Sequence, residues 1–382
     1  MSALRHVIVG GGVAGTEAAN AIRRRAPDDD IVIVTREPYP FYSRIRLQEV
    51  VDGRATPERL LLRRDSWYRE ARIDLRLSTA VQEIDLKRAR IRLHSSQDEP
   101  YDRLLLATGS KPFVPPLVGS ELAGVSTMRS MADALWLKTR CEDRPRVVVV
   151  GGGLLGLELA ATLAALRMPV IVVETAPWLL SRQLDREGGD TLQRLLENRG
   201  LSFRLGSGVT HFLGQSAVTG VELSSREVIP ASLVLISAGI VPEVGLAQSA
   251  GLPIQRGIMV DDHLRTTAEC VFAAGDCAAH RGQVYGIWPA SEAQGRVAGE
   301  RMAGEDVAYD GTVRSNSLKV TGIDVFSIGR IDLPADGTEE INRSDGVYRK
   351  LVRDRENRLV GAILLGDTTG RRDLTATILG GG

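Results

Sequence analysis

The most regular pattern along the chain is a short β-branched run that ends in glycines and leads into apolar residues at helical spacing. It occurs twice, as VIVGGGVAGTEAA from Val7 and as VVVVGGGLLGLELA from Val147. Continuous apolar runs of this length are typical of buried parallel strands, and spacings of three and four residues are typical of helices. The pattern predicts strand 5–9, helix 13–25 and strand 30–35, then strand 146–150, helix 154–166 and strand 169–174.

The two copies align without a gap, so that Gly10, Gly12 and Gly15 fall on Gly151, Gly153 and Gly156. A strand, a glycine turn, a helix and a second strand form the βαβ unit of a dinucleotide-binding fold. The first glycine permits the tight turn, the second leaves room for the pyrophosphate, and the third lets helix and strand pack closely. The helix N-terminus then offers unpaired N–H groups to the phosphates.

An acidic residue follows each glycine turn at the spacing, about 20 residues, at which a carboxylate accepts hydrogen bonds from ribose hydroxyls. These residues are Glu37 and Glu174. Glu174 favours NADH over NADPH at the second site, because a carboxylate repels a 2′-phosphate, although Arg182 is a signal in the other direction. The first site then takes the other common dinucleotide, FAD.

Alternating apolar residues follow each βαβ unit, in RIDLRLSTAVQEIDLKRARIRLHS and LSFRLGSGVTHFLG, and predict small antiparallel sheets. A strand CVFAAGDCAA, a helix over 289–302, and turn-rich strands with a short helix near 371–379 complete the chain. The fold class is α/β, with two Rossmann-like domains and a small C-terminal α+β domain. The expected domains are 1–111 with 234–310 for FAD, 112–233 for NADH, and 311–382.

Composition adds few constraints. The chain of 382 residues is 43% hydrophobic and 25% charged with a formal net charge of zero, which favours neither nucleic acid nor a membrane as partner. No apolar stretch is long enough for a transmembrane helix, and the first strand starts too near Met1 for a signal peptide, so we expect a cytoplasmic protein. Three cysteines and five scattered histidines show no metal-binding spacing.

The motifs GGGVAG, ATGSKP, GGGLLGLE and TTAECVFAAGD together resemble the two-dinucleotide-binding-domain flavoproteins, the glutathione-reductase-like superfamily of pyridine nucleotide-disulfide oxidoreductases. The segments PYPFYSRIRLQEVVDG and NSLKVTGIDVFSIGR are similar to those of NADH:rubredoxin reductases and of the NADH-binding part of assimilatory nitrite reductases. The resemblance implies hydride transfer from NADH to FAD and then electron transfer to a small rubredoxin- or ferredoxin-like carrier.

The resemblance also implies site residues. For FAD these are Gly10, Gly12, Gly15, Glu37, Arg44, Val81, Thr108, Gly109, Arg129, Asp276 and Trp288, and for NAD they are Gly151, Gly153, Gly156, Glu174 and Gly239. Glu158 and Glu49 are the candidate catalytic residues, and Tyr39, Phe41, Tyr42 and Trp288 are candidates to screen the flavin ring. The helix near Pro289 is expected to stabilise negative charge on the reduced flavin.

Two departures from the superfamily narrow the function. No cysteine precedes Cys141, so the redox cysteines of the disulfide reductases are missing, and Cys270 and Cys277 are expected to be buried packing residues. Glu49 stands where ferredoxin reductases carry a lysine, and Lys319 is a candidate to supply the missing cation. An NADH oxidase, an electron-input subunit of a nitrite-reductase-like system and a redox-sensing flavoprotein stay open as alternatives, as does the oligomeric state.

Overall fold

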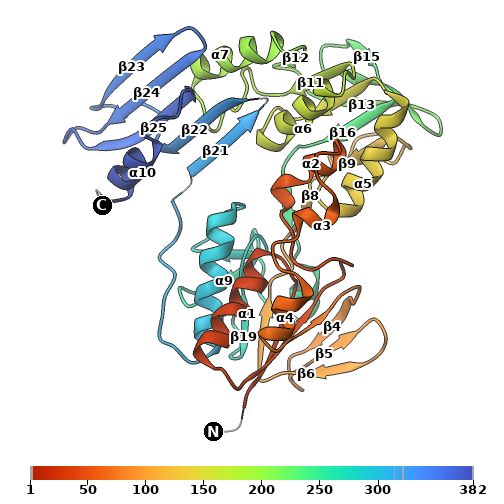
Figure 1. Cartoon of the computed structure of the whole chain (residues 1–382), viewed down its shortest axis with the longest axis vertical. Coiled ribbons are helices and arrows are strands. Elements are labelled where there is room, and N and C mark those ends of the chain that lie inside the picture. The colour runs from red at the N-terminus through yellow and green to blue at the C-terminus, as the bar shows by residue number, and fades with distance from the viewer. Residues whose placement is uncertain (1–2, 314, 321, 381–382) are drawn as a thin grey trace. The chain divides into compact units, whose positions relative to one another are not determined.

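The computed structural model describes residues 3–313, 315–320 and 322–380, and side chains except those of 315–320 (Figure 1). The chain divides into two compact units. The first unit comprises residues 1–43, 57–111 and 240–312, and the second comprises residues 44–56, 112–239 and 313–382.

The first unit is built on a five-stranded sheet of parallel strands, as the β-branched runs predict. Its order is β19 (Val271–Ala273), β7 (Arg103–Leu106), β1 (Arg5–Val9), β2 (Asp30–Val34) and β3 (Ile73–Arg76). The register places His6 opposite both Ile31 and Arg103. The predicted βαβ unit of strand 5–9, helix 13–25 and strand 30–35 is confirmed to within one residue.

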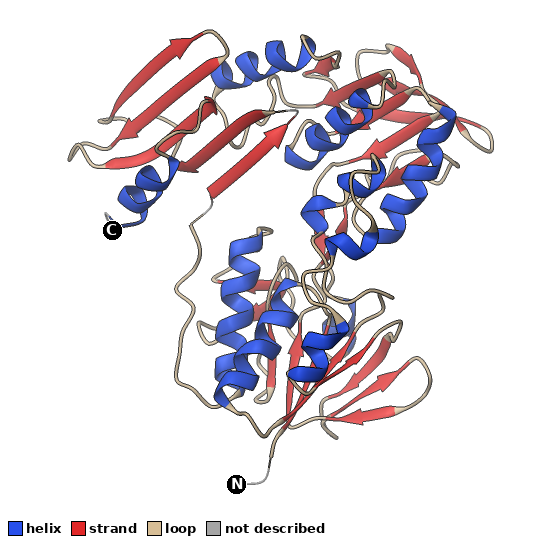
Figure 2. Ribbon diagram, in the orientation of Figure 1, coloured by secondary structure: helices blue, strands red, loops and turns tan. Residues whose placement is uncertain are grey.

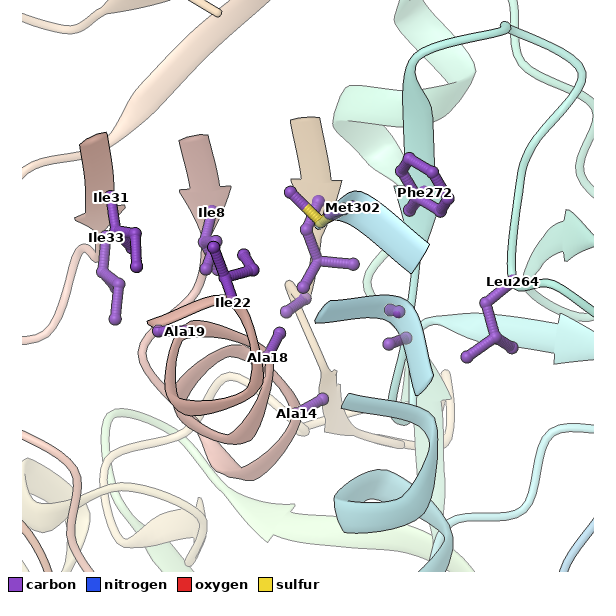
Figure 3. Close-up of a cluster of buried hydrophobic side chains, with 14 of the residues drawn as sticks. Ile8, Ala14, Ala18, Ala19, Ile22, Ile31, Ile33, Leu264, Phe272 and Met302 are labelled. Atoms are coloured by element: carbon purple, nitrogen blue, oxygen red, sulfur yellow. The ribbon is translucent and has the colours of Figure 1, made fainter. Parts of the chain in front are cut away.

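Alternate residues of these strands enter two separate cores. Ile8, Ile31 and Ile33 pack against α1 (Val13–Arg25) and α9 (Trp288–Met302), with Phe272 and Met302 in the same cluster (Figure 3). Residues of the opposite register, such as Val7 and Val32, face the small antiparallel sheet and α8 (Gly245–Ser249). The parallel sheet is therefore covered on both sides, as its continuous apolar strands require.

Helices α1 and α9 lie side by side (Figure 2). A Cβ on Gly295 would lie 2.3 Å from the Ala14 carbonyl oxygen, and one on Gly299 would lie 2.4 Å from that of Ala18. The two backbones approach this closely only because glycine stands at both positions of α9. The packing fixes the N-terminus of α9 relative to the first glycine turn.

The first unit is completed by short elements. The antiparallel sheet is β4 (Val81–Asp85), β5 (Arg90–Leu93) and β6 (Asp98–Pro100); the others are α3 (Pro57–Leu60), α4 (Asp65–Glu70), the pair β18 (Ile258–Val260) and β20 (Ala278–His280), and the pair β8 (Ser110–Pro112) and β17 (Ile240–Pro242) at the chain crossings.

The second unit repeats this plan. Its parallel sheet has the order β12 (Ser202–Leu205), β11 (Val170–Glu174), β10 (Val147–Val150), β16 (Leu233–Ile236) and β9 (Val125–Thr127). Helix α6 (Leu154–Ala165) contacts β10 and β11, and the sheet of β13 (Val209–Gly214), β14 (Val218–Leu223) and β15 (Val228–Pro230) packs on one face. The remaining helical elements are η1 (Arg44–Arg46), α2 (Gln48–Val51), α5 (Met131–Arg140), η2 (Cys141–Asp143) and α7 (Arg186–Glu197).

The C-terminal module is a five-stranded antiparallel sheet of order β21 (Ser315–Val320), β22 (Ile323–Gly329), β25 (Leu359–Gly366), β24 (Val347–Arg353) and β23 (Thr338–Ser344). Helix α10 (Arg371–Gly380) packs on this sheet through Leu374 and Ile378.

The two compact units differ from the expected domain bounds in two places. β16 pairs with β10, so the residues from 234 to 239 group with the second unit rather than the first. Residues 44–56, expected in the first domain, also group with the second unit. The C-terminal module, expected as a separate domain, forms its own antiparallel sheet within the second unit. The sequence holds no local signal for the first two assignments, because each depends on contacts between distant segments.

Candidate functional site

The two glycine turns have the same geometry. The Gly10 N–H donates to the Val34 carbonyl at 2.9 Å, and the Gly151 N–H donates to the Val173 carbonyl at 2.8 Å. Both glycines have positive φ, +116° and +115°, and an added Cβ would lie 2.2 and 2.3 Å from a carbonyl oxygen of the neighbouring strand end. Both positions therefore require glycine.

The other two glycines of each turn differ in their surroundings: the last one is tightly packed, and the middle one borders open space. A Cβ on Gly15 would lie 2.0 Å from the Gly10 oxygen, and one on Gly156 would lie 2.1 Å from the Gly151 oxygen. Gly12 and Gly153 have nothing within 4 Å of such a Cβ. They are the N-caps of α1 and α6, and neither helix start has a side-chain cap. Open space before an uncapped helix N-terminus fits a pyrophosphate at both turns.

The two acidic residues lie near the carboxyl ends of the sheets. The Glu174 carboxylate accepts hydrogen bonds from the backbone N–H groups of Gly152 at 2.7 Å and Ala176 at 2.8 Å. The Glu37 carboxylate accepts a hydrogen bond from the Tyr42 hydroxyl at 2.5 Å. Arg182 is exposed on the segment between β11 and α7. Each carboxylate is thus fixed near its glycine turn, where an adenosine ribose binds in such folds.

Asp276 lies where β7 and β19 end in the first unit. Its carboxylate accepts hydrogen bonds from the Ser110 hydroxyl at 2.8 Å and the Ser291 hydroxyl at 3.5 Å. The adjacent Gly275 N–H donates to the Gln294 side-chain oxygen at 2.8 Å. Ser110, Ser291 and Gln294 were not predicted from the sequence, although Ser110 stands inside the ATGSKP motif that drew attention to its neighbours.

Thr108 and Gly109 lie in this same loop. The Thr108 hydroxyl donates to the Glu243 carbonyl at 2.6 Å, and Gly109 has a φ of +71°. Val81 starts β4, which is held near the end of β2 by the hydrogen bond from the Thr79 N–H to the Thr35 carbonyl at 2.8 Å. The expected flavin-side residues of the first unit therefore gather at one end of its sheet.

Aromatic residues occupy this end too. The rings of Phe41 and Trp288 have centroids 5.7 Å apart, and those of Tyr39 and Tyr42 are 6.3 Å apart. Trp288 is the first residue of α9, whose N-terminus has no side-chain cap. The uncapped N–H groups of α9 are therefore available to an anionic or hydrogen-bond-accepting group.

Glu158 lies beside a cavity of about 70 Å³ within the second unit. The cavity is lined by Arg44, Ile45, Leu47, Gln48, Met128, Arg129, Leu155, Glu158, Leu159, Ile236 and Ser237. Burial raises the pKa of the Glu158 carboxyl to about 7. The Arg44 guanidinium donates to the Arg129 carbonyl at 2.9 Å, which joins the segment before α2 to that before α5. The structure thus brings together three expected site residues from distant parts of the sequence.

Glu49 has a different environment. Its carboxylate accepts two hydrogen bonds from the Arg46 guanidinium, at 2.8 and 2.6 Å, which hold its pKa below the usual value. Gln48, not Glu49, lines the cavity beside Glu158. Lys319 is on β21, and its side chain lies outside the described residues. Glu49 is therefore paired with Arg46, and the expectation that Lys319 supplies a cation near the flavin lies outside the described residues.

All three cysteines are free thiols. Burial raises the pKa of Cys141 to about 11, and Cys277 is fully buried with its Sγ 3.3 Å from the Leu106 carbonyl oxygen. Cys270 is only partly buried, so the expectation that both strand cysteines are buried holds for Cys277 alone. Within the described part of the chain, no group of three His, Cys, Asp or Glu residues has metal-binding geometry, and no helix has the length and apolarity to span a membrane.

Comparison with known proteins explains why two such nucleotide cradles stand in one chain. The pattern of the pyridine nucleotide-disulphide oxidoreductases matches residues 4–295, and that of the rubredoxin NAD⁺ reductase C-terminal domain matches residues 315–380. The chain belongs to the pyridine nucleotide-disulphide oxidoreductase family. Its C-terminal module is the one that accompanies this family in rubredoxin reductases.

Individual family members cover almost the whole chain. Nitrite reductase [NAD(P)H] of Bacillus subtilis is 36% identical over 95% of this chain but 46% of its own length, so the chain spans about half of that relative. NADH-rubredoxin oxidoreductase of Clostridium acetobutylicum is 29% identical over 97% of this chain and 93% of its own. A solved putidaredoxin reductase–putidaredoxin complex matches with a TM-score of 0.87 at 26% identity, over 99% of this chain and 94% of that one.

Proposed function

We propose that this protein is an FAD-dependent NADH oxidoreductase that passes electrons to a small redox carrier protein, such as a rubredoxin or a related iron–sulfur protein. The observation that carries the proposal is the pair of glycine turns with matching geometry and open helix N-termini. The similarity to NADH-rubredoxin oxidoreductase and to a reductase solved with putidaredoxin supports the choice of acceptor.

The first unit would hold FAD. The open space at Gly12 and the uncapped start of α1 suit the pyrophosphate, Glu37 suits the adenosine ribose, and Asp276 suits a ribityl hydroxyl. The Ser110 hydroxyl holds the Asp276 carboxylate in place. Bound FAD would supply a two-electron acceptor that returns electrons singly. Val81, Thr108, Gly109 and Trp288 border the same sheet end. Arg44 and Arg129, which the resemblance implies as FAD residues, lie in the second unit beside Glu158.

The second unit would hold NADH. Gly153 and the start of α6 suit its pyrophosphate, and the fixed Glu174 carboxylate would bind the ribose hydroxyls and repel a 2′-phosphate. Glu158, whose pKa burial raises to about 7, carries a proton through a large part of the neutral range and so can donate a hydrogen bond to a carboxamide oxygen. We propose that it orients the nicotinamide amide in this way.

The cysteines argue against a disulfide relay. The described thiols are free, and the buried Cys277 is bonded to the Leu106 carbonyl and has a raised pKa, so it lacks the thiolate that attacks disulfides. The family's disulfide chemistry therefore has no redox pair here. We infer that electrons leave directly from the flavin, to a partner that carries its own redox centre or, in the oxidase alternative, to oxygen.

The test is anaerobic mixing of flavin-loaded protein with NADH, followed by addition of rubredoxin, a [2Fe–2S] ferredoxin or oxygen. Bleaching by NADH and fast reoxidation by one of the carriers are expected. Reoxidation that is fast with oxygen alone would identify an oxidase instead, and slow reoxidation by every acceptor would favour a redox-sensing flavoprotein. A protein that NADH does not bleach would refute the proposal.

Two matched variants assign the cofactors to their units. Gly12→Ala and Gly153→Ala add the same methyl group to open space, so neither disturbs the fold. Gly12→Ala is expected to lose FAD and keep binding of ADP-ribose, whereas Gly153→Ala is expected to stay yellow and lose ADP-ribose binding. Equal effects of the two variants on FAD content would contradict the assignment.

A second candidate is the electron-input module of a nitrite-reductase-like system, which the 36% identity to Bacillus subtilis nitrite reductase favours. The described residues hold no cysteine cluster for a haem or an iron–sulfur centre. Such a module needs a separate protein to reduce nitrite, so nitrite reduction by NADH only after a haem and iron–sulfur protein is added would establish this role.

A further inference from the structure

The C-terminal module is bonded to the start of α7 through one partly buried carboxylate, that of Asp185. Asp185 is the N-cap of α7, and its Oδ1 accepts a hydrogen bond from the Gly188 N–H at 3.0 Å. Its Oδ2 accepts hydrogen bonds from the Tyr348 hydroxyl at 2.7 Å and the Lys350 Nζ at 3.0 Å, both on β24. A single side chain thus caps the helix and joins the two parts of the second unit.

The β24 side of this junction is buried, whereas the Asp185 side chain is 21% exposed. Tyr348 is 1% exposed and Lys350 is 5% exposed, and Lys350 also pairs with Glu339 at 2.9 Å. The Tyr348 ring packs on Gly188, where an added Cβ would meet ring carbons at 3.3 Å. Burial alone would raise the pKa of Asp185, but the hydrogen bonds from Tyr348, Gly188 and Lys350 lower it, so the carboxylate stays charged. Charged hydrogen bonds of this kind are the strong ones.

The segment from 175 to 184 connects Asp185 back to the second glycine turn. The Trp178 indole N–H donates to the Leu184 carbonyl at 3.1 Å, and the Trp178 side chain lies against Gly189 of α7. Leu179 is fully buried and packs against Gly152. The Gly152 N–H in turn donates to the Glu174 carboxylate. The start of α7 and the expected ribose-binding residue are therefore joined by one short packed segment.

We propose that Tyr348 and Lys350 are positioning residues of the pyridine-nucleotide site, acting through Asp185 and the segment 175–184 on the glycine turn and Glu174. The inference rests on the proposed binding of NADH to this unit. It gives the C-terminal module a part in binding the adenosine half of the nucleotide, although no residue of the module need touch it.

The physical reason for such a coupling is that the C-terminal module restricts the conformations of the nucleotide site before the ligand binds. A ligand that must order a loose segment binds more weakly, because the conformational entropy lost on ordering reduces the binding free energy. With Asp185 held by two donors of the module, the start of α7 and the segment packed on it are already in place. Without those donors the segment gains alternative conformations, and Glu174 shares them.

The experiment measures binding of NAD⁺ and of ADP-ribose, neither of which reduces the flavin, to the flavin-loaded protein by calorimetry. Tyr348→Phe removes one donor and keeps the ring packing, and Lys350→Met removes the other. Each is expected to weaken both ligands about tenfold, or about 1.4 kcal/mol, and to raise the KM for NADH equally. FAD content and the flavin reduction rate at saturating NADH should stay within about twofold of wild type, which separates positioning from loss of the fold.

Arg343→Ala is the matched control, because it removes the exposed bidentate pair with Glu187 at the same junction. Its effect on ADP-ribose affinity is expected to be under about twofold, as for an exposed ion pair. Wild-type affinity in both Tyr348→Phe and Lys350→Met would refute this inference but would leave the proposed function standing. A wild-type protein that binds neither NAD⁺ nor ADP-ribose would refute the proposed nucleotide site itself.

Lys350→Met leaves the carboxylates of Asp185 and Glu339 without their shared cation, so of the two variants it has the greater risk of misfolding. Hydrogen exchange on the wild-type protein needs no variant. Because coupling between two sites is reciprocal, ADP-ribose should slow exchange of the β24 amides, 347–353, several-fold. Protection confined to the glycine turn and the segment 175–184, with β24 unchanged, would overturn the coupling.

Discussion

Glu158 should make the stability of the protein fall as the pH rises from about 4.5 to about 7. Burial raises the pKa of its carboxyl from 4.5 to about 7. Between these values the folded chain holds a proton at Glu158 that the unfolded chain has lost. The free energy of unfolding therefore decreases with pH in this window, and the stability present below pH 4.5 is fully lost above about pH 7.

The size of the effect follows from the shift. The rise in the pKa from 4.5 to about 7 corresponds to about 3 kcal/mol, since each tenfold change in an acid constant is worth about 1.4 kcal/mol. Glu158 is only partly buried, and solvent screening reduces this figure to about 2 kcal/mol. Glu158→Gln keeps the size and polarity of the side chain but carries no charge. It should leave stability unchanged at pH 4 and increase it by about 2 kcal/mol at pH 8.

Glu49→Gln is the matched control, since it makes the same chemical change on the neighbouring α2. The hydrogen bonds from Arg46 lower the pKa of Glu49, so its contribution is present above the usual pKa and lost as the pH falls. Glu49→Gln should therefore destabilise the protein at pH 8, by less than about 1 kcal/mol because the pair is partly exposed to solvent. The two variants should move stability in opposite directions.

The assay is urea unfolding of the full chain at pH 4 and pH 8, with FAD in excess and tryptophan fluorescence as the signal. Trp136 and Trp178 both lie in the second unit and report on its unfolding. The shift in midpoint, at constant dependence on urea, gives the change in stability. A Glu158→Gln protein whose stability relative to wild type is the same at both pH values would refute the reasoning. The pKa near 7 should also disappear from the pH profile of flavin reduction in this variant.

Two further substitutions test the second nucleotide turn. Gly156→Ala places a Cβ 2.1 Å from a backbone oxygen, so it should destabilise the second unit by about 1–3 kcal/mol and lower its urea midpoint. The FAD content at low urea should stay unchanged, and a wild-type midpoint would contradict the packing role of Gly156. Glu174→Gln keeps an oxygen for the Gly152 N–H but removes the negative charge. The ratio of NADH to NADPH affinity, measured by titration, should therefore fall at least about tenfold. An unchanged ratio would show that another residue sets the preference.

The sequence predicted the parallel strands and both glycine turns because these features depend on neighbouring residues. A continuous β-branched run is typical of a strand that is buried on both faces of a sheet. Gly10 and Gly151 have positive φ and lie so close to a carbonyl oxygen that no side chain fits there. The family motifs also pointed to Asp276, whose carboxylate is bonded to Ser110, and to Glu158, which lines a cavity; their roles stay predictions. The serines that hold Asp276 were missed, because a hydroxyl within reach of a carboxylate has no signature in the sequence.

Only the tertiary structure decided which distant residues share an environment. Arg44, Gln48 and Arg129 line a cavity with Glu158, while Glu49, one residue from Gln48, is paired with Arg46 instead. Tyr348 bonds to Asp185 across 163 residues of sequence. Local propensity and spacing carry no information about such pairs. The three donors that keep Asp185 charged and the burial that raises the pKa of Glu158 arise only once the separate segments have packed together.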